Sequence, residues 1–276
     1  MCVFIFIHST GGAEEEPEGT VAEKALAAAR EKLMATRVAS MRVTWPEEAA
    51  KRPESFEPQP IFRYSDPARG YVAAAVWALG KNGRPLAVVT TELQPRFYGR
   101  PRIVYEYLSL TSEPFAVASP DVRWSPKSSA IEFRPIPNSP KPADNERLRL
   151  VQMRSDAKRM TAYEVVGNER CELRMVPQPI HRYRPSSHAN ADGAMFLLAF
   201  GINPEAIVFL ESDGDRWQFA VGHLAGAAKM GAFFDEQPVW ETGPAKYGVD
   251  EPYTASNAVA DIPGIAADGS VIPPEK

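Results

Sequence analysis

The sequence is poor in cysteine, and this limits the kinds of site it can build. Its 276 residues include only Cys2 and Cys171. Two thiols cannot form the multiple disulfides that hold small secreted domains together, and they cannot supply a four-thiolate zinc site. A chain of this length can bury a sizeable core without such cross-links. The sequence therefore predicts a fold held together by packing, and it implies no cofactor and no metal site.

Long hydrophobic runs are also missing. The longest, residues 2–7, is far too short to cross a bilayer, so no membrane span is predicted. The run also lacks the basic residues that open a secretory signal. Two interpretations stay open. Either the run is the end of a signal peptide whose true start lies upstream of Met1, which predicts export, or it is the disordered or edge-strand N-terminus of a cytoplasmic protein.

The sequence has no surplus of basic residues. Its 31 lysines and arginines are outnumbered by 35 aspartates and glutamates, and the formal net charge is −4. Nucleic-acid binding proteins normally carry a basic surface, because neutralising phosphates supplies much of their affinity. We therefore expect a soluble protein with no nucleic-acid partner. Other partners stay unknown.

Signatures of common catalytic sites are absent as well. The sequence contains no Gly-x-Ser-x-Gly, no His-Glu-x-x-His and no phosphate-binding glycine loop. His181 and His188 lie in the same part of the chain as Asp192 and Glu211, but their spacing matches no known pair of metal ligands. We interpret these histidines as polar surface or core residues.

The clearest feature of the sequence is an internal duplication. Residues 58–64 read Pro-Gln-Pro-Ile-Phe-Arg-Tyr, and six of these seven recur in residues 177–183, where histidine replaces phenylalanine. The offset of 119 positions continues without a gap to Glu92, which aligns with Glu211, and 12 of the 35 aligned residues are identical. Unrelated segments of average composition would share far fewer. The pattern predicts one folding unit present twice.

Each copy is expected to be a helix followed by strands. Thr20 and Glu23 form a capping box that opens the first helix, and the second helix is predicted to begin near Asp144. Alternating apolar residues between turn residues then predict antiparallel strands, the first near residues 38–44. The expected fold class is α+β, with two tandem helix-plus-antiparallel-sheet repeats.

Composition sets the expected boundaries between these units. Five prolines between residues 126 and 142 predict an extended connector, and few large apolar residues follow Trp240, which aligns with Trp124. The expected division is an N-terminal segment 1–19, repeat unit 20–124, a proline-rich linker 125–143, repeat unit 144–240 and a flexible tail 241–276.

Strand alternation also predicts the buried core. The side chains expected to be buried are Trp77, Leu79, Val88, Phe196, Leu198, Ile207 and Val208.

The duplicated segments carry one charged pair each. Arg63 and Glu92 in the first copy align with Arg182 and Glu211 in the second. We predict an Arg63–Glu92 and an Arg182–Glu211 ion pair that fix the register of each sheet. The alternative is that the arginines line a groove for an anionic ligand, since a guanidinium suits carboxylate or phosphate. His181, which follows the repeated Pro-Ile, is the remaining candidate binding residue.

The repeated heptad, the following hairpin, a strand that begins Arg-Ile or Arg-Trp and the tryptophan after it resemble a family of uncharacterised bacterial proteins. The resemblance covers roughly residues 20–240. It implies the unit carried twice and, in many members, an export signal, but no known activity.

The leading hypothesis is a non-catalytic binding or structural protein, because the features shared by both copies are packing residues and one charged pair. The alternative is a hydrolase-type enzyme with a site in the second repeat, built from His181, Asp192 and Glu211. These residues would have to converge in a cleft for the enzyme hypothesis to hold.

Overall fold

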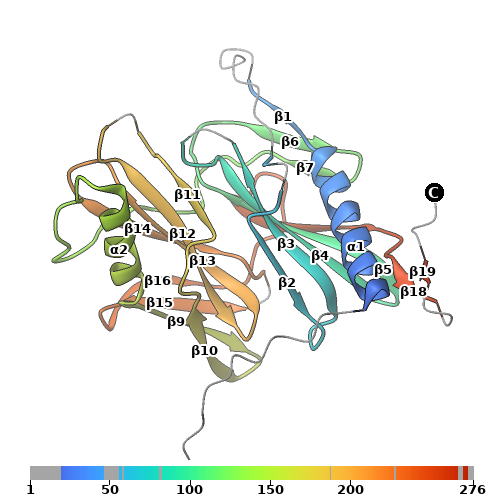
Figure 1. Ribbon diagram of the computed structural model, residues 1–276. Helices are drawn as coiled ribbons and strands as arrows, with labels where there is room; N and C mark the ends of the chain where they lie inside the picture. The colour runs from blue at the N-terminus through green and yellow to red at the C-terminus, as the bar shows by residue number, and fades with distance from the viewer. Residues whose placement is uncertain are drawn as a thin grey trace, which may run out of the picture.

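The computed structural model describes residues 20–46, 56–57, 59–80, 83–186, 188–226, 228–266 and 270–272. The expected N-terminal segment 1–19 and Pro58 of the first heptad lie outside the described residues. Over the described ranges the chain is mostly β-structure, with two helices and several antiparallel sheets (Figure 1). No helix in these ranges is long and apolar enough to span a membrane.

Both helices begin at side-chain caps. Helix α1, Val21–Ala39, follows Thr20, whose hydroxyl accepts the backbone N–H of Glu23 while the Glu23 carboxylate accepts that of Thr20. The predicted capping box is therefore confirmed. Helix α2, Glu146–Ala157, follows Asn145, whose side chain accepts two backbone N–H groups of the first turn. Each cap satisfies backbone donors that a helix start leaves without partners.

The first predicted strand is corrected at its start. Residues 38 and 39 belong to α1, and β1 covers only Arg42–Thr44. The backbone N–H of Ser40 still bonds to Thr36, so the helical hydrogen bonds continue into the segment where alternation suggested a strand. Strand β1 pairs with β6, Ala116–Ser119, which pairs with β7, Val122–Trp124.

The five-stranded sheet, called here the first sheet, takes one strand from the far end of the chain. Its order is β17-β5-β4-β3-β2, and its strands are β2 Phe62–Asp66, β3 Tyr71–Leu79, β4 Ala87–Phe97, β5 Arg100–Ser109 and β17 Tyr253–Val259.

Strand β17 corrects the expectation of a flexible tail over 241–276. Residues 253–259 pair with β5 along their whole length. The segment is rich in small residues, but backbone hydrogen bonds hold a strand without large side chains. Further on, β18, Gly264–Ile265, pairs with β19, Val271–Ile272.

The nine-stranded sheet, called here the second sheet, curls into a half-barrel (Figure 1). Its order is β16-β15-β9-β10-β12-β13-β14-β8, with β11 also paired to β12. Strand β8 lies inside the expected proline-rich linker, where two residues pair with β14. The strands are β8 Arg134–Pro135, β9 Met160–Val166, β10 Glu169–Met175, β11 His181–Tyr183, β12 Asp192–Phe200, β13 Asn203–Ser212, β14 Trp217–His223, β15 Lys229–Phe234 and β16 Gln237–Thr242.

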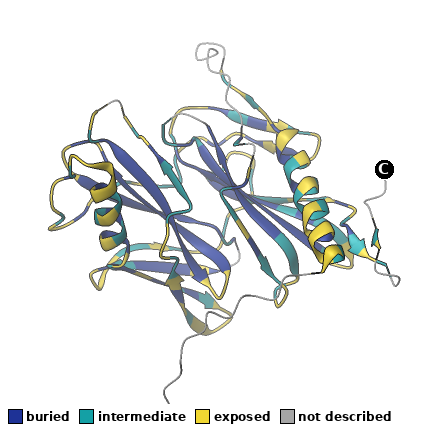
Figure 2. Cartoon of the chain, viewed as in Figure 1, coloured by how far each residue is buried: buried dark blue, intermediate teal, exposed yellow. Residues whose placement is uncertain are grey.

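The two sheets pack face to face and each carries its helix on its outer face (Figure 1). Odd-numbered residues of β3, such as Trp77, pack on the α1 side, and even-numbered residues, such as Val76, pack against the second sheet. In β12, Phe196 packs on the α2 side and Leu197 against the first sheet. Burial is therefore continuous across both sheets, while the outer faces of the helices are exposed (Figure 2).

The expected burial of strand residues is confirmed. All seven side chains predicted for the core are at most 1% exposed. Both faces of these strands are buried, one against a helix and the other against the opposite sheet.

Residues that align at the offset of 119 also have strand partners that align at this offset. Ala73 pairs with Leu93 in the first sheet, and the aligned residues Asp192 and Ser212 pair with each other in the second sheet.

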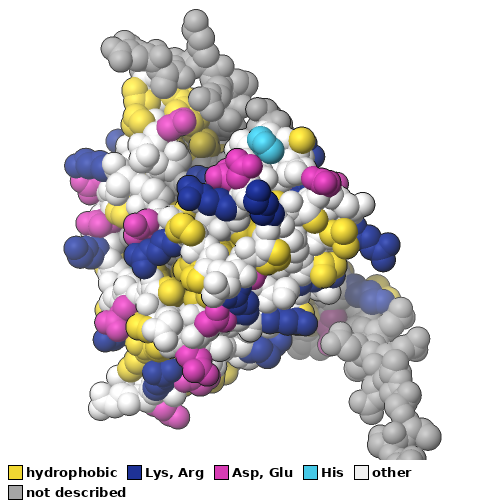
Figure 3. Space-filling model, turned by 90° about the vertical axis from the view of Figure 1, so that its left-hand side faces the viewer, with side chains coloured by type: hydrophobic (Ala, Val, Ile, Leu, Met, Phe, Trp, Pro, Cys, Tyr) yellow, Lys and Arg dark blue, Asp and Glu magenta, His cyan; other side chains and the backbone are white. Residues whose placement is uncertain are grey.

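The face that carries α2 shows acidic and basic side chains interspersed (Figure 3). One basic residue of α2 does not lie on this surface. Arg149 is 3% exposed, and its Nε donates to Asp192 at 3.0 Å. The helix is thereby tied to β12 by a buried ion pair as well as by packing.

Candidate functional site

The two predicted Arg–Glu pairs are wrong. Arg63 donates to Glu31 of α1 at 2.7 and 2.8 Å. Arg182 pairs with Glu146 of α2 at 3.1 Å and with Asp192 at 2.6 Å. Each arginine therefore binds an acidic residue on the helix side of its own sheet.

The reason is the alternation of side chains along a strand. Arg63 stands beside Ala75 and Thr91, whereas Glu92 stands beside Ala74. Side chains in one lateral row share a face, and the next row points the other way. Arginine and glutamate therefore lie on opposite faces of the sheet.

The tyrosine of each heptad makes the contact instead. Tyr64 donates its hydroxyl to Glu92 at 3.0 Å, and Tyr183 donates to Glu211 at the same distance. Tyr64, Ala74 and Glu92 form one lateral row, as do Tyr183, Gly193 and Glu211. Both tyrosine–glutamate pairs face the layer between the sheets. The signal was present in the sequence, because both tyrosines are identical residues of the duplicated segments.

The residues proposed for an enzyme in the second repeat do not converge. Asp192 is bound by Arg149 and Arg182 on the α2 side of the sheet, whereas Glu211 faces the first sheet. His181 is half-buried, and its ring lies 6.2 Å from that of Tyr183. Burial lowers the pKa of His181, so its neutral form is favoured.

At one end of the inter-sheet layer, Glu211 is neutralised by an arginine from the turn between β3 and β4 of the first sheet. We call this the closed end, defined by Tyr183, Glu211 and Arg84. Arg84 Nε donates to Glu211 Oε2 at 2.9 Å, and its Nη2 contacts the other oxygen. Burial lowers the pKa of Arg84, but the hydrogen bond and charge of Glu211 outweigh this, so the pKa is raised. The guanidinium also lies 4.4 Å from the ring centre of Phe133.

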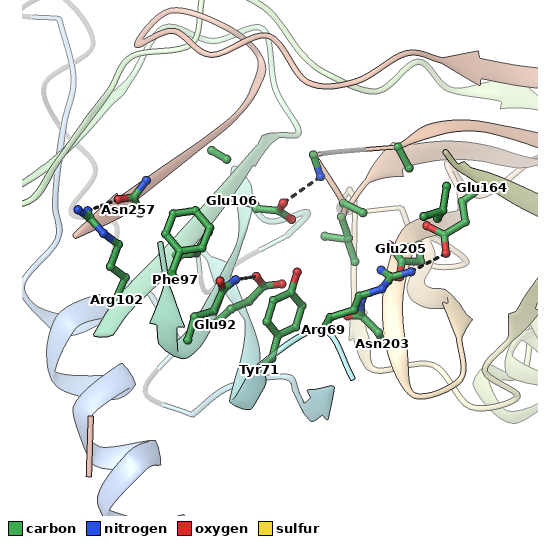
Figure 4. Close-up of a pocket in the computed structure, with 18 of the residues that line it drawn as sticks. Arg69, Tyr71, Glu92, Phe97, Arg102, Glu106, Glu164, Asn203, Glu205 and Asn257 are labelled. Atoms are coloured by element: carbon green, nitrogen blue, oxygen red, sulfur yellow. Dashed lines mark hydrogen bonds and ion pairs between the residues drawn. The ribbon is translucent and has the colours of Figure 1, made fainter. Parts of the chain in front are cut away.

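At the other end, the corresponding glutamate faces a cavity. We call this the open end, defined by Tyr64, Glu92 and the cavity of about 1070 Å³ beside them. Gln94 Nε2 approaches Glu92 at 3.4 Å. The cavity lies between strands of the two sheets, with Glu92, Glu106 and Phe97 on one side and Asn203, Glu164 and Glu205 on the other (Figure 4).

Arg69 reaches into this cavity from the turn between β2 and β3. Its guanidinium donates to Glu164 at 2.7 Å and is ion-paired with Glu205 (Figure 4). Both glutamates are at most 1% exposed. A second arginine, Arg102, bonds to Asn257 at the cavity edge. Four buried glutamates therefore share the cavity with two arginines.

Some buried oxygens of the cavity lack partners. Within the described residues, Asn203 Oδ1 and Glu205 Oε2 accept no hydrogen bond, and the side-chain donor nearest to the Glu106 carboxylate is the Tyr253 hydroxyl. Asn203, Glu205 and Glu106 are 3%, 0% and 8% exposed. Glu106 Oε1 accepts the backbone N–H of Gly226 at 2.9 Å. A buried acceptor without a partner costs free energy, so such groups point to an occupant that donates to them.

The pKa values of the cavity carboxyls agree with this lack of hydrogen-bond donors. Burial raises the pKa of Glu92 to about 7, although hydrogen bonds from Tyr64 and Gln94 oppose the shift. Burial raises the pKa of Glu205 to about 8, against the charge of Arg69. Burial and the negative charge of Glu92 both raise the pKa of Glu106. These carboxylates would be stabilised by an added positive charge.

No protein-family model, curated protein or solved structure matches the chain.

The cavity offers acceptors, negative charge and aromatic surface. Tyr71, Phe97, Tyr98 and Tyr247 line it, and Tyr98 and Tyr247 are largely exposed at its edge. Within the ranges that the structure describes, no group of three or more His, Cys, Asp and Glu residues is arranged to hold a metal ion. The chemistry on offer suits N–H donors on a positively charged organic group.

Proposed function

We propose that the protein is a binding protein whose open end holds a small organic cation. One observation carries the proposal: in the described part of the chain, the buried oxygens Glu205 Oε2 and Asn203 Oδ1 belong to residues that line a large cavity and have no hydrogen-bond partner. An ammonium or guanidinium group would donate to these oxygens and offset the charge of Glu205. The aromatic rings at the edge would add cation–π attraction.

A thermal-shift series at pH 8 tests the proposal. Spermidine, 1,5-diaminopentane and agmatine serve as cationic probes, with glucose and acetate as neutral and anionic comparisons. A ligand of the native state raises the melting temperature, because it stabilises that state by RT ln(1 + L/Kd), where L is the free ligand concentration. We expect the cationic probes to raise it and acetate to leave it unchanged. Equal shifts with acetate, or no shift with any cation, would contradict the proposal.

A second candidate function is acid–base catalysis at the same cavity. It is favoured by Glu92, whose pKa of about 7 would let it exchange a proton near neutral pH. This hypothesis differs from the binding proposal in the fate of the bound compound. Proton NMR of a bound probe over a day would separate the two, since a binding protein returns the probe unchanged.

We also propose that residues 20–124 and 144–240 are tandem repeats. The shared offset of the ladder registers supports this, as does the order in each half of a helix, a paired edge strand and a meander. On this reading the open and closed ends occupy equivalent positions. The sequence change that distinguishes them is Asn203, which stands 119 positions after Arg84.

A further inference from the structure

The closed end contains, within the same chain, an example of what a glutamate in this setting binds. Glu211 accepts the Tyr183 hydroxyl at 3.0 Å and the side-chain amide of Gln218 at 3.0 Å. Its remaining capacity is taken by the two parallel donors of the Arg84 guanidinium. This forked geometry matches the two oxygens of a carboxylate better than a single ammonium does.

Glu92 also has a tyrosine donor and an amide donor, but no guanidinium donates to it in the described part of the chain. It accepts the Tyr64 hydroxyl at 3.0 Å, and Gln94 Nε2 lies 3.4 Å from its other oxygen. Where Arg84 stands in the first half, the second half has Asn203, whose Oδ1 faces the cavity and accepts no hydrogen bond from any described residue. Asn203 Nδ2 donates to Glu205, not to Glu92.

The cavity also supplies an aromatic ring. At the closed end, the Phe133 ring lies 4.4 Å from the Arg84 guanidinium carbon. At the open end, Phe97 lines the same cavity as Glu92 (Figure 4). A planar guanidinium stacks on such a ring while its edge donates to a carboxylate.

We infer that the cation bound at the open end carries a guanidinium group, which sits on Glu92 as Arg84 sits on Glu211. The unpaired oxygen of Glu205 and the buried carboxylate of Glu106 lie in the same cavity and suit a second positive group on the same ligand. The ligand class is an alkylguanidine with a further amine. This inference rests on the proposed function and narrows it from organic cations in general.

Isothermal titration calorimetry of the full chain at pH 8 tests the inference with agmatine, an alkylguanidine amine, and 1,5-diaminopentane, a diamine of similar length. We expect agmatine to bind about tenfold tighter or more. Glu92→Gln keeps the shape of the side chain but loses its charge, and should weaken agmatine binding about tenfold or more. Glu172→Gln, on an exposed side chain outside the cavity, is the matched control and should leave binding unchanged.

Asn203→Arg provides a second test, because it would place a guanidinium from the chain itself against Glu92. We expect this variant to lose agmatine binding while its melting temperature is held or raised. If it fails to fold, Glu92→Gln still decides the question.

The outcomes separate the inference from the proposed function. If the diamine binds as tightly as agmatine, or Glu92→Gln binds agmatine normally, the guanidinium assignment is wrong and the binding of organic cations stands. If neither compound binds the wild-type protein, both fail.

Discussion

The closed and open ends of the inter-sheet layer are built from the same parts. Each has a tyrosine on an edge strand that donates to a glutamate two strands away, at 3.0 Å in both cases. At the closed end Arg84 crosses from the turn between β3 and β4 of the first sheet and neutralises Glu211. At the open end Asn203 occupies the aligned position, and a cavity of about 1070 Å³ lies beside Glu92.

On the proposed function, the difference is that between a structural ion pair and a ligand site built from the same residue types. Removing a long cationic side chain leaves volume, an unneutralised carboxylate and a hydroxyl already positioned to orient it. The cost is the free energy of burying charge without a partner, which raises the pKa of Glu92 to about 7. Glu211 therefore contributes to stability through its ion pair with Arg84, whereas Glu92, on the proposed function, keeps its carboxylate for a ligand.

The largest expected effect is at the closed end. Glu211→Gln would leave the half-buried Arg84 without its carboxylate. Breaking a fully buried pair from one side costs about 3–5 kcal/mol of unfolding free energy, so we expect a loss of up to about that size. Urea denaturation at pH 8 measures this loss. Glu92→Gln is the matched substitution. Equal losses at both ends would contradict the distinction drawn between them.

The open end should respond to the same substitution with the opposite sign. The folded protein holds the Glu92 proton up to a pKa of about 7, against 4.5 for the ordinary carboxyl. The folded state therefore binds more protons between these values, and the unfolding free energy falls as pH rises from about 4.5 to 7. Glu92→Gln removes this fall and should stabilise the protein without ligand by roughly 1–3 kcal/mol at pH 8.

Urea midpoints of wild type and Glu92→Gln at pH 5 and pH 8 check this sign. The two proteins should differ more at pH 8 than at pH 5. If the stability of the wild type and of Glu92→Gln rose by the same amount between pH 5 and pH 8, Glu92 would ionise without cost to the folded state.

A smaller contrast concerns the residue between each tyrosine and glutamate. A Cβ added to Gly193 would lie 2.6 Å from the Tyr183 ring, whereas the corresponding Ala74 already carries one. Gly193→Ala should destabilise by about 1–3 kcal/mol through overpacking. Ala74→Gly, its mirror, should cost about 0.5–1 kcal/mol through backbone entropy. Thermal unfolding of both variants compares them, and a neutral Gly193→Ala would mean that Tyr183 is free to move aside.

The smallest expected effect is on the outer face. The ion pair of Arg63 with Glu31 is about half exposed on the arginine side, and exposed pairs contribute about 0.2–1 kcal/mol. A double-mutant cycle with Arg63→Met and Glu31→Gln should give a coupling energy in that range. Coupling between Arg63 and Glu92 should be near zero, because the two side chains lie on opposite faces.

The sequence predicted what depends on neighbouring residues and missed what depends on distant ones. The capping box of Thr20 and Glu23 and the burial of Trp77 and Phe196 follow from local spacing, and all are observed. The partner of Glu211 could not be predicted, because Arg84 belongs to a turn of the first sheet and meets it only after the two sheets pack.

The charged pairs show the same limit at shorter range. Assigning Arg63 to Glu92 required the correct row across three strands, and a shift of one residue moves a side chain to the other face. The cavity could not be predicted from the sequence, for a further reason. It is lined by β17, whose small residues gave no strand signal.

The position of β17 has a consequence for how the protein is made. A ribosome delivers the chain from its N-terminus, so β5 emerges and the whole second half follows before Tyr253 can pair with Leu108. Until then the edge of β5 has unpaired backbone groups, which invite pairing with other chains. Contacts this far apart in sequence also form slowly. Since Ala255, Ser256 and Asn257 line the cavity, the cavity is completed only after the other strands of both sheets have been synthesised, and a nascent chain stopped before β17 would have an incomplete cavity.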